Sequence, residues 1–350
     1  MSKKSTVLTA MSLMLAISAF TGCSSANGKA ASEKSETGAS VTNTENKETK
    51  TDAEPLKVVC TIFPEYDWTR SILGSHAENV DISYLLDSGI DLHNYQPTAD
   101  DIMKISTCDL FVYVGGESDE WVEDALENAV NKDMKVINLM DALGDFAKAE
   151  ELKEGMQGEE EEESEEEDED EIEYDEHVWL SLKNAKLLCT EIESGLETID
   201  PANAADYKSN LASYVSELDE LDSSFKALVD GASVKTLIFA DRFPFRYFVD
   251  DYGLDYFAAF IGCSAESEAS FETIKFLSDK VKELDCDTVY TLENSNKDIA
   301  NAVISSSGKS GVKIAELNSL QSVSKNDIKD GASYISLMQK NYDVLSGTLK

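Results

Sequence analysis

Residues 159–185 read EEEEESEEEDEDEIEYDEHVWLSLKNA, and this stretch divides the chain in two. Its first half is a dense block of carboxylates, which repel one another too strongly to form part of a packed core. We therefore predict an acidic flexible loop over residues 150–174. A second interpretation makes this loop a collector of cations beside a binding site, although carboxylates alone prefer hard ions such as calcium and magnesium.

Both sides of the acidic block show the same alternation of elements. Short apolar runs rich in β-branched residues alternate with segments of helical spacing, which is typical of βαβ units and parallel sheets. The predicted fold class is α/β, with an N-terminal lobe over residues 56–185 and a C-terminal lobe over residues 233–350. Linking helices fill residues 186–232. One of them, from Ala202 to Val229, is either an ordinary amphipathic surface helix or a rigid spine that joins the lobes.

The N-terminus has the features of an exported lipoprotein. Lysines precede the apolar run Val7–Phe20, which is too short for a transmembrane helix, and small residues then lead to Cys23. Residues 1–23 are predicted to be a signal peptide with lipidation at Cys23; a plain secretory signal with an incidental cysteine is the alternative. Residues 24–55 are predicted to be a disordered tether, since they lack large apolar side chains. The protein is expected on the outer face of the bacterial cell membrane.

Size and charge limit the possible partners. The 350 residues are 42% hydrophobic, which suffices for two domains with their own cores. Against 30 lysines and arginines stand 69 aspartates and glutamates, so the formal net charge is -39. Such a balance argues against binding of nucleic acid or of an anionic membrane surface by electrostatic attraction.

Two of the three histidines are candidate metal ligands. His93 follows a predicted strand and His177 follows the acidic block, whereas His76 lies in a polar turn and is predicted to face solvent. Asp241 and Glu293 follow directly on two predicted strands of the second half. Because functional groups of open α/β sheets gather beyond the carboxyl ends of strands, these side chains are predicted to meet in a cleft between the lobes. Two imidazoles and two carboxylates suit zinc or manganese.

Each candidate also has a simpler interpretation. A lone histidine in a loop often only forms a hydrogen bond or faces solvent. Asp241 is equally suited to cap a helix that begins near Phe243, and Glu293 could cap a helix near Asn296. The metal hypothesis therefore depends on whether His93 and His177 meet in space.

The six cysteines give a weaker signal. No CxxC pair is present, which argues against a cysteine-based zinc site. In an exported protein some of the five cysteines after Cys23 could form disulfides, and Cys263 with Cys286 is the pair to test first. An odd number of thiols leaves at least one of them free.

Several motifs resemble those of the solute-binding lipoproteins of bacterial ABC importers for zinc and manganese. Residues 58–64, VVCTIFP, look like the first strand and turn of that family. Residues 89–98, GIDLHNYQPT, are similar to its first ligand loop, which implies a ligand at His93. Residues 175–185, DEHVWLSLKNA, are similar to its second ligand stretch, which implies a ligand at His177. The resemblance extends over residues 56–350.

The resemblance also implies a function and reveals departures. It implies a monomeric protein that captures Zn²⁺, or alternatively Mn²⁺, and delivers it to a membrane permease. Where the family has a His or Glu ligand this chain has Arg242, which is permanently charged and cannot bind a metal. Asp241 is the predicted substitute, and Glu293 is the predicted carboxylate ligand. Glu65 and Glu117 are further oxygen donors.

Rival functions are a secreted metallohydrolase and an adhesin-like or structural lipoprotein with an incidental metal. A hydrolase needs an open coordination position and a general base. No HExxH pattern occurs, and the candidate ligands are spread over the whole chain. The sequence therefore favours a binding protein over an enzyme.

Overall fold

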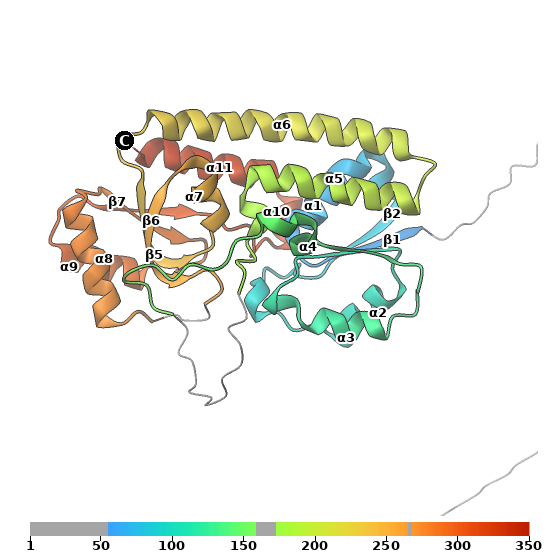
Figure 1. Cartoon of the computed structure of the whole chain (residues 1–350), viewed down its shortest axis with the longest axis horizontal. Helices are drawn as coiled ribbons and strands as arrows, with labels where there is room; N and C mark the ends of the chain where they lie inside the picture. Colours follow the sequence, from blue (N-terminus) through green and yellow to red (C-terminus); the bar gives the residue numbers. More distant parts are fainter. Residues whose placement is uncertain (1–54, 159–172, 265–267, 350) are drawn as a thin grey trace, which may run out of the picture. The chain divides into compact units, whose positions relative to one another are not determined.

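The computed structural model describes residues 55–158, 173–264 and 268–349 (Figure 1). The predicted signal peptide, the lipidation site Cys23, nearly all of the predicted tether and the acidic residues 159–172 lie outside the described residues. None of the helices in the described part combines the length and the apolarity that are needed to span a bilayer.

The first lobe is built on a parallel sheet with the strand order β2-β1-β3-β4. Val58, Val59 and Cys60 of the central strand are almost fully buried, as expected for a parallel sheet that helices cover on both faces. The strands are β1 (Leu56–Cys60), β2 (Val80–Tyr84), β3 (Leu110–Tyr113) and β4 (Lys135–Asn138). The helices that connect them or follow them are α1 (Phe63–Leu73), α2 (Ala99–Thr107), α3 (Trp121–Glu127) and α4 (Leu139–Leu143).

The second lobe repeats this plan with the order β6-β5-β7-β8, again parallel. Its strands are β5 (Thr236–Phe243), β6 (Asp255–Ile261), β7 (Thr288–Leu292) and β8 (Lys313–Leu317). Its helices are α7 (Arg246–Tyr252), α8 (Phe271–Glu283), α9 (Asp298–Ser307), α10 (Lys325–Lys329) and α11 (Tyr334–Thr348). The α/β fold with two parallel sheets that the sequence predicts is therefore confirmed.

Two consecutive helices, α5 (Leu182–Ile199) and α6 (Ala204–Gly231), connect the sheets. Helix α6 has 28 residues and runs past both lobes (Figure 1). Near its start, the Asn210 amide donates to the Ile72 carbonyl of α1, at 2.9 Å. Near its end, the Phe225 ring packs edge-on against Phe248 of α7, with 5.0 Å between the ring centroids. The helix therefore acts as the spine that the sequence offered as one of two interpretations.

A buried tryptophan ties the lobes together beside the second candidate histidine. Trp179 lies in the short helix η5 (Val178–Leu180), and its indole N–H donates to the carbonyl of Ser319 beyond β8, at 2.9 Å. The hydroxyl of Tyr334 in α11 donates to the Trp179 carbonyl, at 2.6 Å. Both side chains are fully buried, so these bonds are shielded from water.

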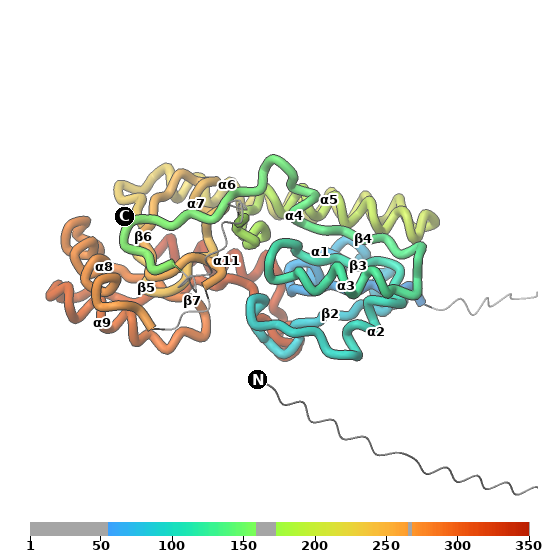
Figure 2. The backbone as a smooth tube through the Cα atoms, turned by 60° about the horizontal axis from the view of Figure 1, so that its bottom comes forward, coloured from blue at the N-terminus to red at the C-terminus, as the bar shows by residue number. Residues whose placement is uncertain are grey.

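The described part of the predicted acidic loop, residues 150–158, has no regular helix or strand but contacts the second lobe. It leaves α4 and crosses to the second lobe, where the Gln157 N–H donates to the Ala259 carbonyl of β6, at 2.9 Å (Figure 2). Lys153 forms an ion pair with Asp255 at the start of β6. Residues 150–158 are therefore packed against the second sheet, which the charge of the neighbouring block did not indicate.

Two further expectations need correction. Strand β5 continues through Phe243, so Asp241 lies within the strand and not in a loop after it; a shift of register between Phe239 and Arg242 accommodates the extension. The cysteines of the described residues are all free, so the proposed Cys263–Cys286 pair is wrong. Cys263 follows the carboxyl end of β6 whereas Cys286 precedes the amino end of β7, and parallel strands place these ends at opposite edges of one sheet.

Candidate metal centre

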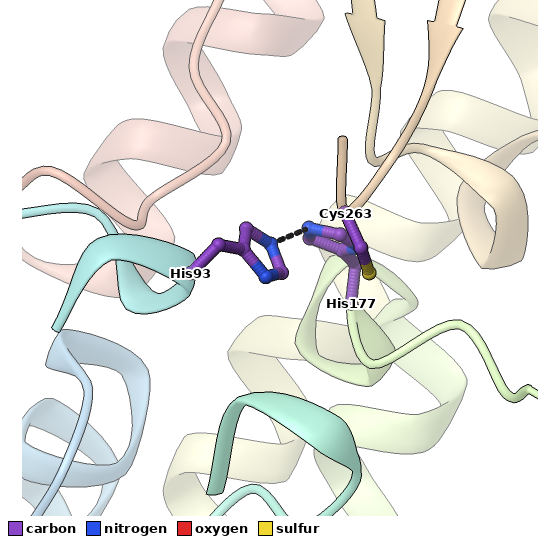
Figure 3. A group of neighbouring side chains, drawn as sticks. All are labelled: His93, His177 and Cys263. Atoms are coloured by element: carbon purple, nitrogen blue, oxygen red, sulfur yellow. Dashed lines mark hydrogen bonds between the residues drawn. The ribbon is translucent and has the colours of Figure 1, made fainter. Parts of the chain in front are cut away.

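The two candidate histidines meet. His93 belongs to the short helix η2 (Leu92–Asn94), which follows β2, and His177 lies directly before η5. The two Nε2 atoms are 3.1 Å apart, and the ring planes are tilted by 55° (Figure 3). The His177 side chain is fully buried and that of His93 is 6% exposed. The pair is therefore shielded from bulk water.

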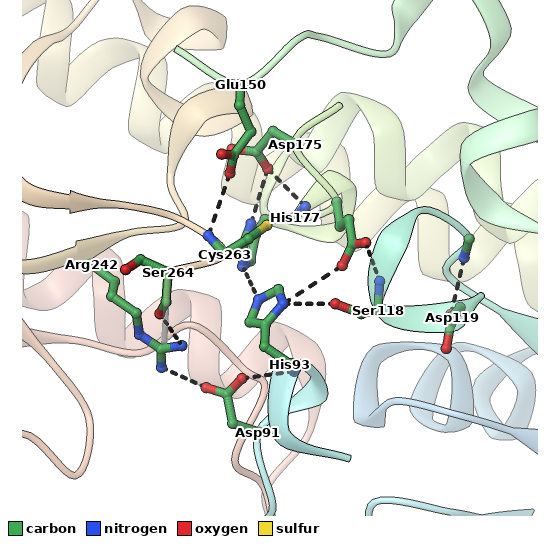
Figure 4. A network of polar contacts seen from close by, with 12 residues as sticks. Asp91, His93, Ser118, Asp119, Glu150, Asp175, His177, Arg242, Cys263 and Ser264 are labelled. Atoms are coloured by element: carbon green, nitrogen blue, oxygen red, sulfur yellow. Dashed lines mark hydrogen bonds and ion pairs between the residues drawn. The ribbon is translucent and has the colours of Figure 1, made fainter. Parts of the chain in front are cut away.

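The backbone and the ring of His93 are each held by a neighbour. The Asp91 carboxylate accepts the His93 backbone N–H, at 3.1 Å, and thereby caps the first turn of η2. On the ring, Nδ1 lies 2.8 Å from the hydroxyl of Ser118 and 3.7 Å from Oε2 of Glu176 (Figure 4). A carboxylate beside Nδ1 favours the proton on that nitrogen, which leaves the Nε2 lone pair directed towards His177.

A single carboxylate fixes His177. Asp175 Oδ1 accepts the His177 backbone N–H, at 2.8 Å, and also lies 3.0 Å from the ring Nδ1. An ionised carboxylate only accepts hydrogen bonds, so Nδ1 carries a proton. Carboxylate–imidazole pairs of this kind orient histidines that bind a metal through the other ring nitrogen.

The environment shifts the pKa values of the two imidazoles in opposite directions. Burial, together with the positive charge that His177 can carry, lowers the pKa of His93 to about 3. Burial also acts to lower the pKa of His177, but the carboxylates of Asp175, Glu176 and Asp91 together outweigh it, and the net shift is upward. His93 is therefore neutral at neutral pH, and the space between the two Nε2 atoms suits one cation, either a proton or a metal ion.

A third side chain joins the pair from the second lobe. Within the described ranges, His93, His177 and Cys263 form a group whose ligand atoms all lie within 4.8 Å of one another (Figure 3). Cys263 follows β6 after the glycine Gly262. The absence of a CxxC pair gave no reason to expect a cysteine ligand. Cys263 nevertheless lies just beyond the carboxyl end of a strand, as Asp241 and Glu293 were expected to do.

The structure does not bring Asp241 or Glu293 into this group. The oxygens of Asp241 accept the backbone N–H groups of Arg242, at 2.9 Å, and of Leu292, at 3.2 Å. Those of Glu293 accept the N–H and the hydroxyl of Ser319, at 2.7 and 2.6 Å. Both carboxylates therefore bind the protein's own donors. They line a neighbouring polar pocket of about 470 Å³.

Arg242 stands at the position where the resemblance implied a ligand, and it bridges the lobes. Its guanidinium pairs with Asp91, at 2.6 Å, and donates to the Ser264 carbonyl, at 3.4 Å (Figure 4). It thus contacts the residue that caps the His93 turn and the residue that follows Cys263. Of the other oxygen donors, Glu65 is fully buried, accepts the N–H groups of Thr61 and Ile62 at the start of α1, and does not belong to the group around the pair.

Comparisons with known proteins place the chain among zinc-uptake components. The model of a family described as "ZnuA: Zinc-uptake complex component A periplasmic" matches residues 58–347. The chain is 32% identical over 293 residues to the zinc-binding lipoprotein AdcA of Streptococcus pneumoniae (strain ATCC BAA-255 / R6), an alignment that covers 84% of this chain and 56% of AdcA. It is 31% identical over 296 residues to the high-affinity zinc uptake system protein ZnuA of Bacillus subtilis (strain 168). That alignment covers 85% of this chain and 88% of ZnuA.

Solved structures show the same fold. The Zn(II)-bound ZnuA-like domain of Streptococcus pneumoniae AdcA superposes with a TM-score of 0.65 at 29% identity, covering 84% of this chain and 99% of that domain. The metal-dependent lipoprotein YcdH of Bacillus subtilis gives a TM-score of 0.67 at 27% identity, and the match covers 84% of this chain and 99% of YcdH. The chain spans little more than half the length of the AdcA proteins that it matches. The match over residues 58–347 shows that this chain belongs to the ZnuA family of zinc-uptake components.

Proposed function

We propose that this protein captures Zn²⁺ outside the cell through His93 and His177. The observation that carries the proposal is the 3.1 Å separation of the two Nε2 atoms. Two nitrogen ligands at about 2.0–2.1 Å from a tetrahedral zinc ion lie about 3.3 Å apart, so the observed separation is close to that of a zinc-bound pair. A site whose ligands already lie close together binds with a smaller free-energy cost of ordering.

Zinc is preferred to manganese on the chemistry of the donors. Imidazole nitrogen suits zinc, whereas manganese favours carboxylate and water oxygen, and the affinity order of divalent metals places zinc above manganese. The carboxylates nearest the rings, Asp175 and Glu176, are placed against the Nδ1 atoms and so orient the imidazoles instead of facing the shared Nε2 side. The names of the relatives AdcA and ZnuA, which specify zinc, support the same choice.

The proposal includes delivery of the ion to an ABC permease in the membrane. The lipoprotein description of AdcA and the features of residues 1–23 support a lipid anchor at Cys23 on the outer face of the cell membrane. The protein would act there as a monomer. Since α6 and the Trp179 contacts hold both lobes, release of zinc would proceed through local rearrangement of the ligand loops and not through wide opening of the lobes.

Competition with a chromophoric zinc chelator tests the binding step. We expect His93→Ala and His177→Ala each to weaken zinc binding more than about 100-fold. Loss of a direct ligand should cost more affinity than loss of a residue that only hydrogen-bonds to a ligand. His76→Ala is the matched control, because its imidazole also pairs with a carboxylate, Asp206, at 2.8 Å. Unchanged affinity in both of the first two variants would contradict the proposal. The same titration with Mn²⁺ tests the preference between the ions.

A further inference from the structure

We propose that Cys263 supplies the second lobe's ligand to the zinc ion, so that two imidazoles and one thiolate hold it. This inference rests on the proposed zinc-binding function and adds the identity of a donor. The Cys263 Sγ lies within 4.8 Å of one ring nitrogen of His93 and of one ring nitrogen of His177. In a tetrahedral site with zinc–nitrogen bonds of about 2.05 Å and a zinc–sulfur bond of about 2.3 Å, nitrogen and sulfur are about 3.6 Å apart. The observed group lies within reach of that geometry.

The backbone around Cys263 lies close to the His177 ring because the preceding residue is a glycine. Gly262 packs directly on the His177 ring, and a Cβ at that position would lie 2.9 Å from the ring Cε1 and 3.1 Å from the Phe243 carbonyl oxygen. A larger residue would push the chain away from the imidazole. The Cys263 N–H donates to Glu150, at 3.4 Å, which also fixes the turn. The close contact therefore holds the thiol beside the His177 ring.

The other donors of the second lobe have different roles. Arg242 cannot bind a cation and instead pairs with Asp91. Asp241 and Glu293 direct their oxygens to backbone and hydroxyl donors. Among the described residues, Cys263 is the second-lobe side chain that groups with the two histidines. A ligand from this lobe is thus retained at a new position, while the arginine takes up a structural role.

Without a bound ion, burial and the Glu150, Asp175 and Glu176 carboxylates raise the pKa of the Cys263 thiol, so the thiolate forms only together with the ion. When Zn²⁺ binds, the S–H bond of Cys263 breaks, a Zn–S bond forms and the proton leaves to solvent, with no change in oxidation state. The unit of Zn²⁺, thiolate and two neutral imidazoles then carries one positive charge. The carboxylates of Asp175 and Glu176 lie against the outer nitrogens of the rings and face this charge. Glu176 Oε2 is buried and makes no hydrogen bond, so its negative charge is available to the centre.

A thiolate donor would set the metal preference. Sulfur is a soft ligand that favours zinc and disfavours manganese, which relies on hard oxygen donors. We therefore expect stronger discrimination against Mn²⁺ than in a site completed by a carboxylate. The variant Cys263→Asp supplies a carboxylate instead. It should bind zinc more weakly and show a smaller difference between its affinities for Zn²⁺ and Mn²⁺.

Spectroscopy of the full chain tests the assignment. X-ray absorption at the zinc edge should show one sulfur neighbour at about 2.3 Å in the unsubstituted protein. With Co²⁺ in place of zinc, a sulfur-to-cobalt charge-transfer band should appear in the near ultraviolet. Cys263→Ser should abolish this band and weaken zinc binding at least about tenfold. Cys286→Ser, in the same lobe but outside the group, should leave the charge-transfer band and the zinc affinity unchanged.

The possible failures are distinguishable. If zinc binds to the unsubstituted protein with nitrogen neighbours but no sulfur neighbour, Cys263 is not a ligand while the two-histidine site stands. If zinc does not bind, or binds equally well without His93 and His177, the proposed function itself fails. The measurement at the zinc edge uses the unsubstituted chain, so it decides the assignment even if Cys263→Ser does not fold.

Discussion

Arg242 of β5 and Asp91 of the His93 turn form an ion pair between the lobes, with 2.6 Å between Nη2 and Oδ2. The two side chains are only 19% and 14% exposed. The arginine lowers the pKa of Asp91 although burial acts against it. The position that the resemblance assigns to a metal ligand therefore serves here to join the two lobes beside the histidine pair.

The first prediction concerns this ion pair. Arg242→Gln leaves the shielded Asp91 carboxylate without its counter-charge, and we expect the free energy of unfolding to fall by about 1–3 kcal/mol. Denaturant unfolding measures the change. Asp91→Asn and the double variant complete a cycle, in which the double variant should cost less than the sum of the single ones. Strict additivity would mean that the two residues are not coupled.

The second prediction concerns the carboxylate that orients His177. Asp175→Asn keeps the size of the side chain but removes the charge that fixes the proton on Nδ1, so zinc binding should weaken about 10–100-fold. Chelator competition at constant pH measures the effect. Asp206→Asn alters a similar carboxylate–imidazole contact, at His76, and should leave the affinity unchanged. Equal effects of the two substitutions would argue for a general loss of charge and against orientation of the ring.

The third prediction concerns a glycine that packs against Glu176. Gly116 has a φ of 87°, and a Cβ there would lie 2.6 Å from Glu176 Oε1. Gly116→Ala combines backbone strain with displacement of a carboxylate that stands beside His93, and we expect a loss of about 2–4 kcal/mol of stability.

Gly311 provides the control for this substitution. Its φ is 82°, and a Cβ at that position would meet nothing within 4 Å. Gly311→Ala should therefore cost only the backbone strain, about 1–2 kcal/mol. Thermal or denaturant unfolding of both variants compares a glycine whose Cβ would meet Glu176 with one whose Cβ would meet nothing. If both variants lose the same stability, the contact with Glu176 has no energetic weight.

The fourth prediction concerns pH. Burial raises the pKa of Asp67 to about 6, even though its carboxylate accepts the Tyr334 backbone N–H, at 2.9 Å. The folded state therefore binds this proton more tightly than the unfolded state, whose pKa is about 3.9. The contribution of Asp67 to stability consequently decreases as pH rises from about 4 to about 6, by about 3 kcal/mol in all, and stays low above that range.

Asp67→Asn tests the sign of this effect. The amide can still accept from Tyr334 but carries no charge at any pH. The stability of the variant relative to the unsubstituted protein should rise between about pH 4 and pH 6 and then level off. Unfolding measured across this range gives the difference directly. A constant difference over the whole range would show that Asp67 titrates alike in the folded and unfolded states.

The sequence predicts much of the fold because its signals are local. Apolar runs of strand length, bounded by Gly, Asp and Asn, predict the strands, and Thr98 marks the start of α2 through a capping box. The long apolar periodicity after Pro201 predicts α6. His93 and His177 could be chosen because the motifs around them are distinctive, although their separation was not predictable from spacing alone.

The remaining donors could not be predicted in this way. Asp241 and Cys263 both lie near the carboxyl end of a strand of one sheet, so position along the chain does not tell which of them faces the cleft. The register shift in β5 keeps Asp241 bonded to backbone N–H groups, whereas Gly262 allows the chain after β6 to touch the His177 ring. Such details depend on contacts between segments that are far apart in the sequence.

By itself, the sequence determines two parallel α/β lobes, the long helix that joins them and two loops that present imidazoles, because these features arise from short-range periodicity, capping and turn chemistry. The tertiary structure decides that the imidazoles face each other, that Arg242 pairs with Asp91, and that a sulfur atom is the nearby donor of the second lobe. The physical reason is that these relationships depend on strand register and on packing between the lobes, where a shift of one residue turns a side chain to the opposite face.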